Sequence, residues 1–158
     1  VSPQETGPRW KALAAAWADP VGHAGWYAFN DVFAFIALLG SGDTARADAL
    51  IARARERALR DRGDNRAMTT DVALPLMQGL RAYANGDGAT AMQRLLPLRA
   101  TAHHFGGSHA QRDFIDQTLY ACVARGGDKA IGRALLNERR MVKAGTGLTG
   151  YWGERVAA

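Results

Sequence analysis

The chain has 158 residues and a mass of 17.0 kDa, enough for one domain that folds without a metal ion or a disulfide. An apolar fraction of 47% and a charged fraction of 22% are typical of globular proteins and exclude disorder of the whole chain. A single cysteine, Cys122, excludes an internal disulfide framework and a Cys-based zinc site. Lys and Arg exceed Asp and Glu by 20 to 15, which gives a net charge of +5.

The longest nearly uncharged apolar run, residues 32–42, is too short to cross a bilayer, so we expect no membrane partner. The chain begins Val1-Ser2-Pro3-Gln4, with neither an initiator Met nor a signal segment. We interpret it as an excised or trimmed piece of a longer protein. The absence of a signal favours a cytoplasmic location.

Apolar residues recur with a spacing near 3.6, and no stretch alternates with period two for long enough to predict a sheet. The sequence therefore predicts an all-α fold of about seven helices. Their expected ranges are residues 9–18, 26–39, 44–61, 71–84, 88–103, 109–124 and 129–142. We expect residues 1–8 to be an N-terminal tail, residues 61–70 a linker and residues 143–158 a C-terminal tail.

Three Gly-Asp steps separate these helices in pairs, at Gly42-Asp43, Gly86-Asp87 and Gly127-Asp128. Glycine supplies a left-handed residue after a helix end, and aspartate caps the helix that follows. A small residue stands four positions after each Asp, and a leucine follows three or four positions later. These residues are Ala47 and Leu50, Ala91 and Leu95, and Gly132 and Leu135. The steps recur after 44 and then 41 residues, a spacing typical of stacked helical hairpins.

The segment from Tyr83 to Asp87, followed by Ala91, resembles the turn of a tetratricopeptide (TPR) repeat. Three further strings resemble the tetratricopeptide repeat protein 38-like family: HAGWYAFNDVFA at residues 23–34, GGSHAQRDF at 106–114 and ALLNER at 134–139. The resemblance spans residues 23–140 and implies similarity to the C-terminal portion of longer repeat proteins.

This resemblance implies a TPR-like α-solenoid, a right-handed stack of antiparallel hairpins. The repeat domain would cover residues 9–142, with hairpins at about 26–61, 71–103 and 109–142. The family pattern Phe-Asn-Asp-x-His has Phe33 at its His position here, so any chemistry of that His is in doubt. The family resembles a binding scaffold without an agreed reaction.

Asn30 and Asp31 interrupt an otherwise apolar helix, and neither can be buried without a polar partner. Gln111, Arg112 and Asp113 are the nearest to a matching polar set in the sequence. Two interpretations stay open. In the first, Arg112 satisfies Asp31 in a structural network between adjacent repeats; in the second, these residues face a ligand.

The segment before residue 109 has the pattern of a helix start. Ser108 and Gln111 are spaced as a capping box, in which each side chain bonds the backbone N–H of the other. This explains both residues without a functional role, but it leaves Arg112 and Asp113 unexplained.

His103, His104 and His109 surround one loop, but adjacent histidines on a helix point about 100° apart and do not readily share one ion. No His-x-x-x-His or Cys-x-x-Cys spacing is present, so we expect neither a metal site nor a cofactor. Cys122 lies in an apolar stripe, where a thiol behaves as a small core residue. With no nucleophile or phosphate-binding fingerprint, the sequence predicts no catalytic residue.

Four arginines, Arg46, Arg53, Arg57 and Arg60, share one side of the helix expected at residues 44–61. Acidic residues intersperse them, and no aromatic residue interleaves with them to stack nucleic-acid bases. The pattern favours a solvated helix face over an acidic protein partner, and it disfavours nucleic acid.

Two functions follow. The favoured one is a scaffold without intrinsic catalysis, which binds a peptide or protein, a second copy of itself, or its own missing N-terminal repeats on a concave helical face. The alternative is an enzyme or small-molecule-binding protein in which a His acts as base and Arg112 binds an acidic group. Both draw on the same candidate binding residues: Asn30, Asp31, His103, His104, His109, Arg112 and Asp113.

Overall fold

The computed structural model describes residues 7–157, which are helical and contain no strand. This confirms the all-α class. Of the N-terminal tail expected at residues 1–8, residues 1–6 lie outside the described range, and residues 7–8 are helical, contrary to the expectation. The elements are α1 (Gly7–Ala16), α2 (Ala28–Ser41), α3 (Thr44–Arg60), α4 (Asp64–Ala67), the π-helical turn η1 (Met68–Ala73), α5 (Leu74–Ala84), α6 (Gly88–Leu95), α7 (Leu98–Thr101), the 3₁₀ turn η2 (Ala102–Phe105), α8 (His109–Ala124), α9 (Lys129–Lys143) and α10 (Gly147–Ala157). Within the described residues, no helix has the length and apolar character needed to cross a membrane.

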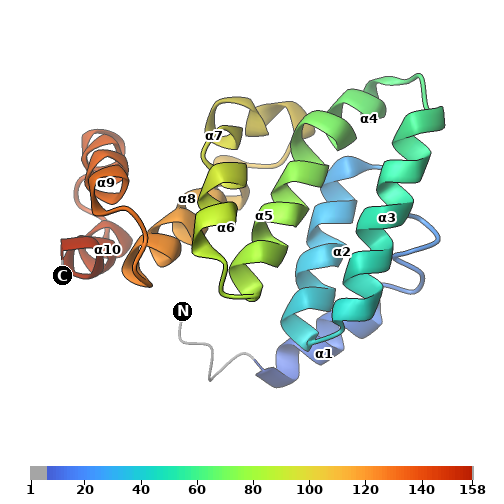
Figure 1. Ribbon diagram of the computed structural model, residues 1–158, viewed down its shortest axis with the longest axis horizontal. Helices are drawn as coiled ribbons and strands as arrows, with labels where there is room; N and C mark the ends of the chain where they lie inside the picture. Colours follow the sequence, from blue (N-terminus) through green and yellow to red (C-terminus); the bar gives the residue numbers. More distant parts are fainter. Residues whose placement is uncertain (1–6, 158) are drawn as a thin grey trace.

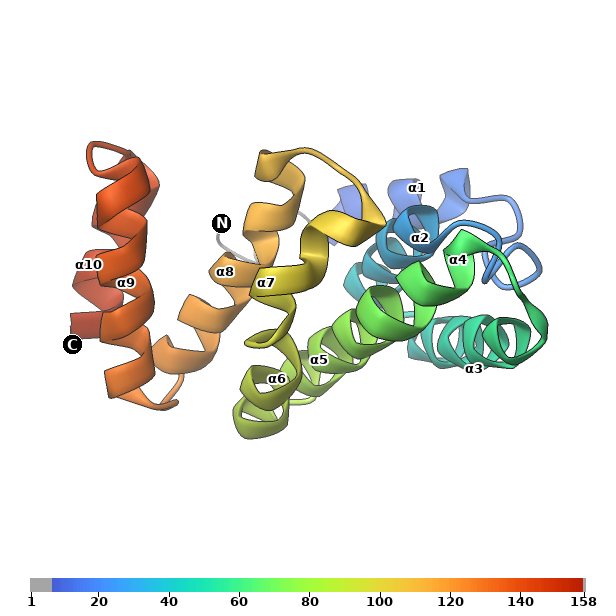
Figure 2. The ribbon, with the colours of Figure 1, turned by 90° about the horizontal axis from the view of Figure 1, so that it is seen from above.

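The helices form an elongated row in which α2 pairs with α3 and α5 pairs with α6 (Figure 1). The row continues through α8 to α9 and α10, which lie at the opposite end from α3 (Figure 2). Helix α1 packs against α2, and α10 packs against both α9 and α8.

The three Gly-Asp turns have the expected backbone geometry. The glycine just after each first helix is left-handed, with φ of 84° at Gly42, 83° at Gly86 and 102° at Gly126. The aspartate that follows accepts backbone N–H bonds from the first turn of the next helix. The capping carboxylates are those of Asp43, Asp87 and Asp128.

Small residues allow the paired helices to approach closely. The three residues expected for this role, Ala47, Ala91 and Gly132, are all buried. A Cβ at Gly132 would lie 2.6 Å from Val123 Cγ1 of α8 and 2.8 Å from Val156 Cγ1 of α10. Gly132 is therefore the point at which three helices meet.

The expectation of a C-terminal tail at residues 143–158 is wrong, because α10 occupies most of that segment. Its Trp152 ring stacks on Tyr120 of α8 at 5.6 Å between centroids, and Val156 is buried against α9. The glycines and threonines of this segment are weak helix formers, but tertiary burial of two large apolar side chains overrides that propensity.

Three other boundaries differ from the prediction. Only residues 61–63 of the expected linker lie outside helix, since α4 and η1 lead directly into α5. The helix expected at 88–103 is broken at Pro97, which has no N–H to donate and clashes with the preceding turn. The helix expected from Trp26 begins at Ala28, because Tyr27 is still extended, with φ of −150°.

Replacing Gly132 with Ala should lower the free energy of unfolding by about 1 kcal/mol or more, because overpacking a three-helix contact outweighs the gain in helix propensity. The added methyl would meet the branched side chains of Val123 and Val156, which have little room to rotate. Urea denaturation measures the change.

Gly150→Ala is the matched control, since Gly150 is also helical but a Cβ added there would meet no atom within 4 Å. It should leave stability unchanged or raise it by up to about 1 kcal/mol. The same sign of change in both variants would contradict the close packing at Gly132.

Candidate functional site

The structure places six of the seven expected binding residues in two separate cavities. Asn30 and Asp31 line a small cavity of about 190 Å³ between α2 and the loop before it. A second, larger cavity of about 810 Å³ lies between α7–η2, α8 and the end of α9; we call it the α8 cleft. Four of the seven residues line the α8 cleft: His103, His109, Arg112 and Asp113. His104 is exposed, with its ring 4.1 Å from that of His103, and is absent from the residues that line the cleft.

Aromatic rings, not polar groups, connect α2 to α8 and η2. Phe33 lies 6.3 Å from Phe114 of α8, and Phe29 lies 4.6 Å from Phe33 and 5.6 Å from Phe105 between ring centroids. Phe33, at the position where the resembled family has His, is therefore part of an apolar contact.

Asp31 holds the loop that precedes α2. Its buried carboxylate accepts the N–H of Gly25 at 2.9 Å, where φ is +84°. Asn65 of α4 fixes the same loop, since it donates to Gly25 O at 2.8 Å and accepts from Ala28 N at 2.9 Å. Burial raises the pKa of Asp31 to about 6. The hydrogen bond from Gly25 and the positive charge of Arg57 both lower this pKa, but burial outweighs them.

Arg112 does not pair with Asp31, so the first interpretation of their relation is wrong. Its guanidinium donates to the carbonyl oxygens of Gly106, at 3.2 Å, and Gly107, and it lies 3.4 Å from His109 Nδ1. Within residues 7–157 no carboxylate lies in ion-pair range of it. The capping box of the same loop, Ser108 with Gln111, is confirmed.

Asp113 is occupied by structural contacts. It accepts from Arg139 at 2.8 Å and from Lys143 at 2.9 Å, and Arg139 also donates to Thr149 at 3.1 Å. Burial alone would raise the pKa of Asp113, but the hydrogen bonds from Arg139 and Lys143 outweigh it and hold the pKa below its usual value. The carboxylate thus ties α8 to α9, and through Arg139 to α10.

A second ion-pair group crosses the same cleft. Arg99 donates to Asp116 of α8 and to Glu138 of α9, each at 2.7 Å. Asp113 and Asp116 are both paired with other cations. Among the described residues, no carboxylate of the α8 cleft is therefore left to pair with Arg112. Apolar side chains complete the wall: Leu96, Pro97, Ile115 and Val142.

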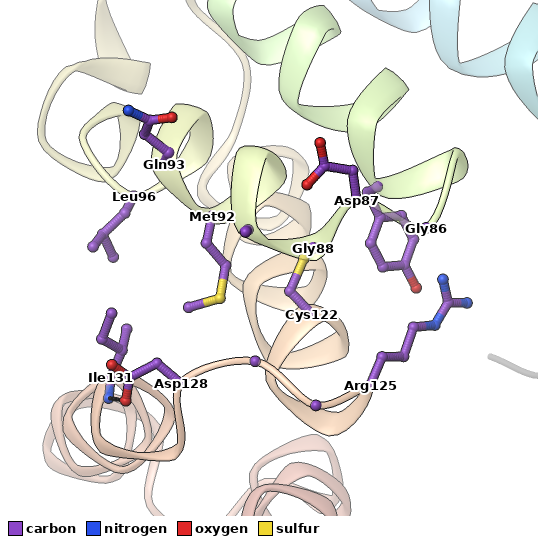
Figure 3. A pocket seen from close by; sticks show the side chains of 14 residues that line it. Gly86, Asp87, Gly88, Met92, Gln93, Leu96, Cys122, Arg125, Asp128 and Ile131 are labelled. Carbon is purple, nitrogen blue, oxygen red and sulfur yellow. Dashed lines mark hydrogen bonds between the residues drawn. The ribbon is translucent and has the colours of Figure 1, made fainter.

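A third cavity, which sequence reasoning missed, lies between α6 and the α8–α9 turn (Figure 3). We call it the turn groove; its volume is about 690 Å³. Its lining includes Tyr83, Asp87, Met92, Gln93, Leu96, Cys122, Arg125, Asp128 and Ile131. The repeated Gly-Asp steps were the available signal, because stacked hairpins bring their turns to the same end.

The arginines of α3 are largely paired with nearby acids. Arg46 binds Asp43, and Glu56 binds both Arg53 and Arg60. Arg57 differs, since its guanidinium lies 3.4 Å over the exposed ring of Trp26. One aromatic residue therefore does join this face, contrary to the sequence-based expectation.

In the part of the chain that the structure describes, no three His, Cys, Asp or Glu side chains gather where they could hold a metal ion. No family model and no solved structure matches the chain. A function must therefore be inferred from the α8 cleft and the turn groove themselves.

The buried Asp31 should make stability depend on pH. The folded chain binds a proton at this carboxyl with a pKa of about 6, whereas the unfolded chain releases it near 3.8. The free energy of unfolding should therefore fall by about 2 kcal/mol as pH rises from 4 to 6, and level off above pH 7. Asp31→Asn keeps an acceptor for Gly25 but should remove this contribution.

Urea unfolding of both proteins at several pH values from 4 to 7 isolates Asp31, because other titrating groups cancel in the difference. Parallel profiles for the wild type and Asp31→Asn would contradict the assignment.

Asp113→Ala should lower the free energy of unfolding by about 3 kcal/mol, because it leaves the buried charge of Arg139 without its carboxylate. Arg112→Ala removes hydrogen bonds to backbone carbonyls in a half-exposed loop and should cost about 1 kcal/mol. Thermal and urea denaturation of the two variants compares them directly. Equal losses would mean that Arg112 is as structural as Asp113.

Proposed function

We propose that this chain is a TPR-like interaction module that binds a segment of a peptide or protein partner in the α8 cleft and has no catalytic activity of its own. The proposal includes a right-handed solenoid arrangement of the hairpins and a cytoplasmic location. The row of paired helices, each joined by a capped Gly-Asp turn, supports the repeat architecture.

The observation that carries the proposal is the unmet charge of Arg112 beside an apolar wall. Among residues 7–157, Arg112 bonds only carbonyl oxygens and His109, so a partner carboxylate would be its natural counter-ion. Val142, which is 82% exposed, and the neighbouring Met141, which is 88% exposed, provide apolar surface at the α9 edge. We infer a partner segment with an acidic residue next to an apolar one.

The enzyme alternative has less support, because its candidate groups do not converge. Asp31 lines a different cavity from His103 and His109, and Asp113 is already held by Arg139 and Lys143. A His acting as general base needs a neighbouring group to orient it, and His109 lies beside the cationic Arg112.

Selection from a random displayed peptide library on the immobilised full chain tests the proposal. We expect the enriched peptides to share an Asp or Glu beside an apolar residue. Fluorescence anisotropy with one enriched peptide should then show affinity at least about tenfold weaker for Arg112→Glu.

Arg55→Glu is the matched control, since Arg55 is exposed on α3 and does not line the cleft. It makes the same charge change and should leave affinity within about twofold. Equal losses in the two variants, or enrichment of peptides without acidic residues, would contradict the proposal. Light scattering on the free chain shows whether the bound partner is a second copy.

A further inference from the structure

The turn groove is formed where two hairpin turns stack on each other. The α5–α6 turn contributes Gly86 and Asp87, and the α8–α9 turn contributes Arg125, Gly126 and Asp128. Helix α6 covers one side of the groove, and the first turn of α9 lies across from it (Figure 3). At about 690 Å³, the space is of the size that small organic ligands occupy.

One end of the turn groove is apolar. Met92 of α6 and Leu96, the residue that follows α6, extend toward Ile131 of α9 (Figure 3). Cys122 of α8 lines the same space and is 1% exposed. The unbranched thioether of Met92 adapts readily to differently shaped apolar groups.

The other end carries one cation with no carboxylate to neutralise it. The guanidinium of Arg125 lies 4.3 Å over the ring of Tyr83, which orients it across the gap between the two turns. Among the described residues, no carboxylate is in ion-pair range of Arg125.

The two carboxylates at the rim of the turn groove, those of Asp87 and Asp128, cap helices. Asp87 accepts the N–H of Thr90 at 2.9 Å, and Asp128 accepts the N–H of Ala130 at 2.7 Å. As helix caps they interact with the positive ends of α6 and α9. The two carboxylates therefore face the helix ends that they cap, and Arg125 is the cation in the lining of the groove.

We propose that the turn groove binds a small monocarboxylate with an apolar body. The carboxylate pairs with Arg125, and the apolar body lies between Met92, Leu96 and Ile131. An uncharged amide of the same shape fills the apolar end but gives Arg125 no counter-ion, so it binds more weakly. This site is separate from the partner segment proposed for the α8 cleft, because it uses a different arginine.

The test is an NMR titration of the ¹⁵N-labelled full chain with 4-phenylbutyrate and, separately, 4-phenylbutanamide. We expect the acid to cause saturable chemical-shift changes centred on the backbone N–H groups of Gly88, Gly126 and Ile131. The 4-phenylbutanamide ligand should bind at least tenfold more weakly. Arg125→Gln should weaken binding of the acid by at least tenfold.

Arg133→Gln is the matched control, since Arg133 is exposed on α9 and does not line the groove. It should bind the acid as the wild type does, and so should Arg112→Glu, which separates this site from the α8 cleft. If the Arg125→Gln variant does not fold, as shown by loss of chemical-shift dispersion, Ile131→Glu takes its place. This variant puts a charged carboxylate where the apolar body of the ligand would lie, and it should weaken binding of the acid by a similar factor.

The backbone amide of Cys122 gives a second readout, because Cys122 lines the groove from α8. Saturating 4-phenylbutyrate should shift this amide in the wild type but not in Arg125→Gln. The proposal would be overturned if the acid and the amide bound with equal affinity, or if binding of the acid did not saturate by 10 mM. Chemical-shift changes centred on the α8 cleft would also overturn it.

Discussion

The Gly-Asp turn is the constraint on which the rest of the molecule depends. A left-handed glycine ends one helix, and an aspartate one or two residues later caps the next, so the two helices must fold back on each other. A small residue in the first turn of the second helix then allows close packing, as at Ala91 and Gly132. Because successive hairpins stack, their turns lie along one edge of the row (Figure 1), and the space between the α5–α6 and α8–α9 turns is the turn groove.

Ion pairing determines which charges remain available to a partner. Asp113 and Asp116 both lie on α8, and both are bound by arginines from neighbouring elements, Arg139 and Arg99. These bonds join α8 to its neighbours and remove the two carboxylates that could have neutralised Arg112. In the turn groove, helix capping does the same to Asp87 and Asp128. In both places the acids have structural roles, and among residues 7–157 an arginine is left without a carboxylate in ion-pair range.

Local signals in the sequence predicted local structure well. The caps at Asp43, Asp87 and Asp128 and the box at Ser108 depend on residues within four positions of each other, and all are present. Helix α10 was missed because its stability comes from contacts of Trp152 and Val156 with distant helices. The predicted pairing of Asp31 with Arg112 failed for the same reason. Helical periodicity gives the side of a helix on which a residue lies, but it does not identify the neighbour on that side, which for Asp31 is the backbone N–H of Gly25.

The break at Pro97 links the two candidate sites. It ends α6 and redirects the chain into α7 and η2, which form one wall of the α8 cleft, while α6 forms one wall of the turn groove. Leu96, the residue before the proline, lines both cavities. A continuous helix over residues 88–103 would have lacked the bend that places α6 and α7 against different parts of α8 and α9. The side chain of Leu96 is therefore a wall that the two cavities share, and the bend at Pro97 determines where one cavity ends and the other begins.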